Sequence, residues 1–171
     1  ASCGSSLKQH ATSWLMYADD YDEKLGGSYH QGVGYWYTVL ESYGCTAETR
    51  KCPAERDLDP GYGCNWRGVG YNIGHPTRSG LGNPIYDGLK LSVIKHPTEL
   101  VLMGDGYDSR TTTPNHPLGW DIYNEYIYVE AYDHPSYFGR HSQGNNFNFV
   151  DGHVEWFRGP AVRSVVWAWN Q

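Results

Sequence analysis

This 171-residue chain contains four cysteines, Cys3, Cys45, Cys52 and Cys64. Their chemistry depends on whether they pair as disulfides or bind a metal ion. The gaps between them are 41, 6 and 11 residues, so the chain has no C-x2-C pair and four-cysteine zinc is the weaker interpretation. An even number of cysteines is what disulfides require. Three pairings are open, and we favour Cys3–Cys52 with Cys45–Cys64, which would tether the N-terminal segment to the loops that follow.

A second set of reactive residues lies in RHSQGNNFNFVDGH, residues 140–153. His141 is followed by nine residues and then by Asp151, Gly152 and His153. This set could bind a metal or could be structural. We favour a structural β-hairpin in which His141 stands at the strand entry and hydrogen-bonds a carboxylate or carbonyl. A metal bound by His141, Asp151 and His153 is less favoured, because hairpin pairing does not bring a strand's far end to its turn.

The hairpin itself is predicted from the alternation in NNFNFVDGHVEWF. Phe147 and Phe149 share one face and should enter the core, and Val154 and Trp156 face them from the return strand. The Asp-Gly pair between these strands is a type I′ turn signal.

An acidic run, ADDYDE, ends the first helical segment and supplies Asp19, Asp20, Asp22 and Glu23. Acids at a helix C-terminus oppose the helix dipole by about 0.3–1 kcal/mol each, so a cation, a basic side chain or backbone N–H groups should offset them. Calcium bound by Asp19, Asp20 or Asp22 is one candidate. The alternative is a solvated acidic turn, since the spacing is not that of an EF-hand loop.

The common catalytic motifs are missing from the sequence. There is no G-x-S-x-G elbow, no H-E-x-x-H pair and no complete G-x-G-x-x-G loop. We therefore expect a non-enzymatic protein with no cofactor other than a candidate Ca²⁺, and a hydrolase has the least support.

The composition narrows the class of protein further. Aromatic residues make up 15% of the chain and 21 residues are glycine, which favours a β-rich body with many turns. The net charge is −6 and no basic run occurs, so nucleic acid is an improbable partner. No run of 18 apolar residues is present.

The order of elements predicts a single α+β domain over residues 1–171. Residues 1–22 form a helix, because Cys3, Leu7, Ala11, Trp14 and Ala18 recur at helical spacing. Residues 23–88 are loop-rich, with a short helix over 35–43 and a strand near 69–73. Residues 89–171 hold the sheet, with strands at 99–105 and in the 140–158 hairpin, a strand or short helix at 124–132, and an apolar tail. The tail is a candidate subunit interface through Val165, Val166, Trp167 and Trp169.

Three segments together resemble one bacterial family. CGSSLKQHATSWLMYADDYDEKL is similar to a C-x-x-N-L-K-Q…Y-A-x-D-Y-D segment, Cys52-Pro53 resembles a mid-chain Cys-Pro, and His141 with Asp151-Gly152 matches the closing motif. VIKHPTELVLMGDG, ending near Asp105, also fits. The family is the prepilin-type, processing-associated H-X9-DG group, which is related to type IV pilins and type II secretion pseudopilins.

The resemblance implies a type IV pilin-like fold, an N-terminal helix packed on an antiparallel sheet with long irregular, disulfide-tethered loops. It also implies an exported, extracellular or cell-surface structural subunit that assembles with copies of itself. Family members are anchored in the membrane through a hydrophobic N-terminal half-helix, and this sequence departs from the pattern because it lacks that segment.

A cell-surface carbohydrate-binding or adhesive module is the alternative function. It rests on the 15 Tyr and 7 Trp, which could form stacking platforms for a polysaccharide or glycan. The same rings also suit a core and subunit contacts, which is the stronger interpretation.

Overall fold

The computed structural model describes residues 2–54, 56, 59–65, 69–74, 76–80, 82–105, 141–142 and 144–158. The predicted element at 124–132 and the apolar tail with Val165, Val166, Trp167 and Trp169 lie outside this part of the chain. The helices and strands, in chain order, are α1 (Cys3–Asp20), β1 (Lys24–Leu25), β2 (Tyr29–His30), β3 (Gly34–Tyr35), α2 (Trp36–Val39), η1 (Glu41–Tyr43), β4 (Tyr62–Cys64), β5 (Asn72–Ile73), α4 (Pro84–Asp87), β6 (Leu89–Lys90), η2 (Leu91–Val93), β7 (Val101–Asp105), β8 (Gly144–Phe149) and β9 (Val154–Arg158).

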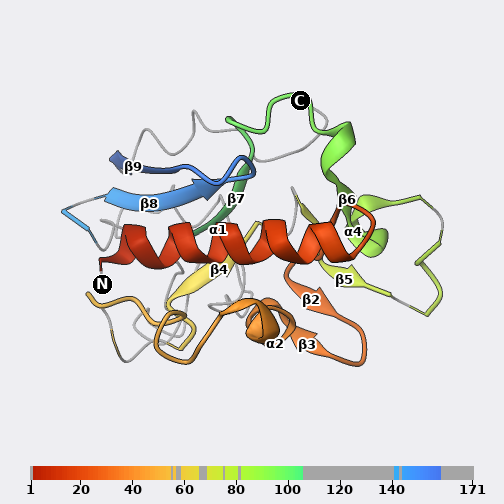
Figure 1. Cartoon of the computed structure of the whole chain (residues 1–171), viewed down its shortest axis with the longest axis horizontal. Coiled ribbons are helices and arrows are strands. Elements are labelled where there is room, and N and C mark those ends of the chain that lie inside the picture. The colour runs from red at the N-terminus through yellow and green to blue at the C-terminus, as the bar shows by residue number, and fades with distance from the viewer. Residues whose placement is uncertain are drawn as a thin grey trace, which may run out of the picture.

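A long helix packed on an antiparallel sheet forms the centre of the fold (Figure 1). The sheet has the strand order β4-β7-β8-β9, and α1 packs against β7, β8 and β9. Two smaller sheets, β1-β6 and β3-β2-β5, belong to the segment that follows α1. The mixed helix-and-antiparallel-sheet class predicted from the sequence is therefore confirmed.

The sequence of α1 explains where it starts and which face it buries. Ser2 caps it, because the Ser2 hydroxyl accepts a hydrogen bond from the Ser5 N–H at 3.2 Å. The buried stripe follows the predicted spacing and contains Cys3, Leu7, Ala11, Trp14 and Ala18. Glycine between α1 and β2 allows close packing, since a Cβ on Gly26 would lie 2.7 Å from the Trp14 ring.

The hairpin of β8 and β9 is confirmed, but the predicted turn type is wrong. A type I′ turn needs positive φ at both central residues, whereas only Gly152 of this turn has one, at +88°. The Gly152 N–H donates to the Phe149 carbonyl at 2.8 Å, so Val150 and Asp151 form the turn and Gly152 follows it. Glycine is favoured here because it adopts the left-handed conformation without strain.

The two faces of β8 are unlike each other. Phe147 and Phe149 are buried, as predicted, and they contact the Phe157 ring of β9. Asn148 points the other way, toward α1, where its amide donates to the Leu7 carbonyl at 2.6 Å. Val154 and Trp156 do not face Phe147 and Phe149, because they pair with Asn148 and Asn146 on the other face of the hairpin. Trp156 is 45% exposed.

The loop-rich segment contains more regular structure than the sequence predicted. The helix expected over 35–43 is present as α2 and η1, and the strand near 69–73 is β5. The short strand β4 was not predicted. Its three residues are buried because β4 pairs with β7, which aligns Tyr62 with Asp105 and Cys64 with Met103.

The predicted disulfide tethers are not seen. All four cysteines are described and buried, and none is in a disulfide. Of the two favoured pairs, the structure brings Cys3 and Cys52 together with their sulfurs 2.7 Å apart, which is longer than a disulfide bond of about 2.05 Å. Cys64 instead directs its sulfur at the Leu102 carbonyl, 3.7 Å away. The loop around Cys52 is held by an ion pair, in which Arg50 Nε lies 2.5 Å from the Asp59 carboxylate.

Candidate functional site

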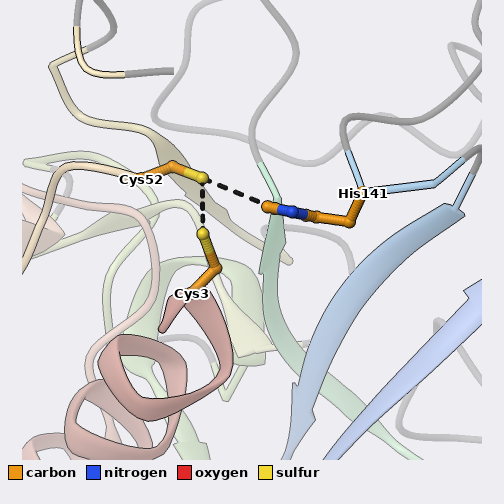
Figure 2. Close-up of side chains that lie close together, drawn as sticks. All are labelled: Cys3, Cys52 and His141. Carbon is orange, nitrogen blue, oxygen red and sulfur yellow. Dashed lines mark hydrogen bonds between the residues drawn. The ribbon is translucent and has the colours of Figure 1, made fainter. Parts of the chain in front are cut away.

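Three side chains from distant segments converge at the N-terminal end of α1. Cys3 comes from the first turn of α1, Cys52 from the loop before β4, and His141 from the chain just before β8 (Figure 2). Their ligand atoms all lie within 4.8 Å of one another. In the described part of the chain, these residues make the only group of three or more His, Cys, Asp or Glu side chains able to hold a metal ion.

Contacts with residues nearby in the structure position the Cys3 and Cys52 side chains. Cys3 follows the Ser2 cap directly, so its place is fixed by the start of the helix. The loop of Cys52 lies against Gly61, where a Cβ would come within 2.5 Å of the Cys52 backbone nitrogen. The Gly61 N–H also donates to the Arg50 carbonyl at 2.8 Å, which ties the loop to the start of β4.

His141 is held by a tight backbone bend and by β9. It exchanges two backbone hydrogen bonds with Gly144, of 3.0 and 3.1 Å, around Ser142, whose φ is +53°. The indole N–H of Trp156 donates to the His141 carbonyl at 2.8 Å. Gly144 is required under that indole, because a Cβ there would lie 2.4 Å from the ring.

A buried carboxylate completes the cluster. Asp105, at the end of β7, is fully buried, and its Oδ1 lies 3.3 Å from His141 Nε2. Its Oδ2 accepts a hydrogen bond from the Asn146 N–H at 2.6 Å. The prediction that His141 interacts with a carboxylate or carbonyl at the strand entry is therefore supported by this contact.

The ionisation of the cluster follows from these contacts. The hydrogen bond with Asp105, and then that with Cys52, raise the pKa of His141 to about 9 despite its partial burial. Burial, reinforced by the hydrogen bond with Cys52, raises the pKa of the Cys3 thiol to about 11. At neutral pH the His141 imidazole and the Cys3 thiol are therefore both protonated.

This arrangement does not match a cysteine–histidine–acid relay. In a relay the acid binds one ring nitrogen and the nucleophile the other. Here the same atom, His141 Nε2, faces both Asp105 Oδ1 at 3.3 Å and Cys52 Sγ at 3.4 Å. A cysteine nucleophile also needs a lowered thiol pKa, whereas that of Cys3 is raised. The donor set of two sulfurs and an imidazole is instead typical of metal ligands.

The rest of the H-X9-DG motif lies at the other end of the hairpin. Asp151 accepts hydrogen bonds from its own turn, from the His153 N–H at 3.1 Å and from His153 Nδ1 at 2.6 Å. The His153 ring stacks on Phe149, with centroids 4.2 Å apart. Asp151 and His153 therefore do not join His141, and the less favoured metal site at those three residues is not assembled.

The acidic run at the end of α1 is divided among separate partners. Asp22 lies 2.9 Å from Lys90 Nζ and 3.9 Å from Lys24 Nζ, and these lysines lower its pKa. Asp20 accepts a hydrogen bond from the Tyr43 hydroxyl at 2.9 Å. Basic and hydroxyl groups thus offset the acids. Calcium at Asp19, Asp20 or Asp22 stays a prediction that this geometry does not favour.

No family model, curated protein or solved structure matches the chain. In the described part of the chain, no helix has the length and apolar character needed to cross a membrane.

The sequence named each of Cys3, Cys52 and His141 but did not join them. The even number of cysteines favours a pair of Cys3 and Cys52 alone, and closeness in sequence groups His141 with Asp151 and His153. Asp105 entered only as the end of a buried strand. Cysteine and histidine side chains can bind the same metal ion even when they are far apart in the sequence. The presence of both residue types is therefore the feature from which the cluster could have been predicted.

Proposed function

We propose that this chain is a structural, non-catalytic subunit of the pilin-like or pseudopilin-like kind, which is exported and assembles into a filament or surface appendage through contacts between copies. The proposal begins from the resemblance to the H-X9-DG group. The observation that carries it is the convergence of the three resembling segments on one structural unit, the junction between α1 and the four-stranded sheet.

Each of the three segments contributes to that junction. The helix segment supplies Cys3 and Lys8, and the Lys8 ammonium donates to the Gly152 carbonyl in the closing motif at 2.7 Å. The Cys-Pro segment supplies Cys52 beside Cys3, and the start of the closing motif supplies His141 beside Cys52. Residues that recur in a structural family are expected to fix its fold, and these residues join the helix to the sheet.

The chemistry of the junction also favours a scaffold. Its polar groups are engaged with one another, and the Cys–His–Asp contacts lack the geometry of a catalytic relay. A filament subunit needs a rigid body that presents its outer surfaces to neighbours. A helix that is hydrogen-bonded to Asn148 and Gly152 of the hairpin meets that need.

Electron microscopy of native cells with an antibody raised against this chain tests the proposal. We expect gold label along filaments or short surface appendages, and native material that sediments as a polymer. A strictly monomeric protein in its native setting would contradict it. Glycan-array binding by such a monomer would favour the carbohydrate-binding alternative.

A further inference from the structure

We propose that Cys3, Cys52 and His141 bind a zinc-like divalent cation that stabilises the junction between α1 and the sheet, with the Asp105 carboxylate beside His141. This inference is independent of the filament proposal, because it depends only on the cluster in Figure 2. It assigns the cluster a stabilising role and no reaction.

The donor set is the first argument. Two cysteine sulfurs and an imidazole nitrogen form a soft, mixed N/S set of the kind that tetrahedral structural zinc prefers. A pair of hydrogen-bonded thiols needs neither a histidine nor a buried carboxylate beside it. A divalent cation accounts for the three ligands together, because the two thiolates neutralise its charge and the imidazole adds a neutral nitrogen donor.

The distances are the second argument. Around a tetrahedral zinc, adjacent nitrogen and sulfur ligands stand about 3.6 Å apart, from the usual bond lengths. His141 Nε2 lies 3.4 Å from Cys52 Sγ. The two sulfurs, 2.7 Å apart, would have to separate to about 3.8 Å when the ion binds.

The surroundings are the third argument. Cys52 and Asp105 are fully buried, and Cys3 is 8% exposed, so the cluster is closed like a structural site. His141 is the partly exposed member, with 18% of its side chain accessible, and it marks the side from which an ion would enter. Binding replaces the thiol protons and the proton on Nε2, which leave to solvent.

The first test measures metal content and cysteine state in the same native preparation. The full chain is purified without a metal-affinity tag or chelator, and zinc is determined by elemental mass spectrometry. Cysteines are alkylated under denaturing conditions with and without prior reduction. We expect about one zinc per chain and four alkylated thiols without reduction. A Cys3–Cys52 disulfide, or thiols that hold no zinc, would overturn the proposal.

The second test uses the metal alone as a probe of the reduced protein. Co²⁺ titration should give the intense visible bands of tetrahedral cobalt bound by sulfur and nitrogen, and Zn²⁺ should displace them. Cys52→Ser and His141→Ala should each weaken Zn²⁺ binding at least tenfold, and Asp105→Asn by about 10–100-fold. Cys45→Ser is the matched control, a buried cysteine outside the cluster, and should leave the Zn²⁺ affinity unchanged.

The wild-type titration keeps the proposal testable if a variant does not fold. Zn²⁺ should raise the melting temperature of the reduced wild-type chain in proportion to the logarithm of its concentration, since it binds the folded state. An unchanged melting temperature together with the absence of cobalt bands would refute the site without any substitution. Equal loss of Zn²⁺ affinity in Cys45→Ser would also count against it.

Discussion

The two ends of α1 are held by different kinds of contact. At its N-terminal end the helix is fixed by directional bonds from residues far along the chain, such as Asn148 to the Leu7 carbonyl and Lys8 to the Gly152 carbonyl. At its C-terminal end it is surrounded by rings from nearby sequence, with Tyr17 in contact with Trp14, Tyr21, His30 and Tyr43. Ring packing tolerates small shifts, whereas hydrogen bonds between buried groups specify one register.

This difference indicates which end of α1 contributes most of the folding free energy and which end fixes the position of the helix on the sheet. Burial of large rings should supply most of the free energy at the C-terminal end, because apolar area removed from water scales with side-chain size. The polar anchors at the N-terminal end should contribute less energy but decide how α1 sits on the sheet. Five substitutions, each with a stated expectation, separate these roles, beginning with the largest expected effect.

Trp14→Ala should be the most damaging change. Trp14 is fully buried in the C-terminal half of α1, so its loss should lower the free energy of unfolding by about 3–5 kcal/mol. Chemical denaturation measures this. Met16→Ala, two residues away and 50% exposed, is the control and should change stability by less than about 0.5 kcal/mol. Similar losses from both would contradict the assignment of stability to the ring cluster.

Two buried histidines should make the protein sensitive to acid. Burial lowers the pKa values of His10 and His30 from 6.5 to about 4. Both are neutral when folded but take up protons near pH 6.5 when unfolded, so the unfolded state binds more protons in this window. The contribution of these two histidines to the free energy of unfolding should therefore be constant above pH 6.5, should fall toward pH 4 by about 3 kcal/mol for each histidine, and should level off below pH 4.

Replacing each histidine separates the two contributions. His30→Asn acts at the C-terminal end of α1, and His10→Gln in the middle, where His10 Nε2 lies 2.9 Å from the Thr49 carbonyl. Each variant should flatten the slope of stability against pH between 6.5 and 4, whatever its effect at neutral pH. An unchanged slope in both would show that these imidazoles are not buried neutral groups.

Asn148→Ala should have an intermediate effect at the N-terminal end. The substitution removes the bond to the Leu7 carbonyl and the bond, 2.8 Å long, that the Met103 N–H donates to Asn148 Oδ1. Leaving these buried groups without their partner should cost about 1–3 kcal/mol. Gln9→Ala, which removes an exposed bond to the Gly44 carbonyl, should cost clearly less. Hydrogen exchange should show faster opening of β8 in Asn148→Ala than in Gln9→Ala.

Asp22→Asn should have the smallest effect. Asp22 is exposed and paired with Lys90 and Lys24, and exposed ion pairs contribute little and are screened by salt. The melting temperature should fall slightly at low ionic strength and match the wild type at high salt. The same assay tests calcium at the acidic run: EDTA followed by excess Ca²⁺ should leave the wild-type melting temperature unchanged if Lys90 is the only counter-charge, and a rise would restore the calcium hypothesis.

Local pattern was enough to predict the elements with strong periodicity. The spacing of Leu7, Ala11, Trp14 and Ala18 predicted α1, and the apolar run that ends at Asp105 predicted β7. The alternation around Phe147 and Phe149 predicted the hairpin. Strand β4 was missed because Tyr62–Cys64 is short and rich in turn-forming neighbours, so only its pairing with β7 makes it a strand.

The sequence by itself determined the helix, the hairpin, the α+β class and the chemical types available at the site. These depend on side-chain periodicity and on residue identity, which are local properties. Only the tertiary structure decided which of those residues meet. It placed His141 with Cys3, Cys52 and Asp105 rather than with Asp151 and His153. The reason is that strand pairing and the packing of α1 on the sheet bring together residues that are up to 138 positions apart in the sequence, from Cys3 to His141.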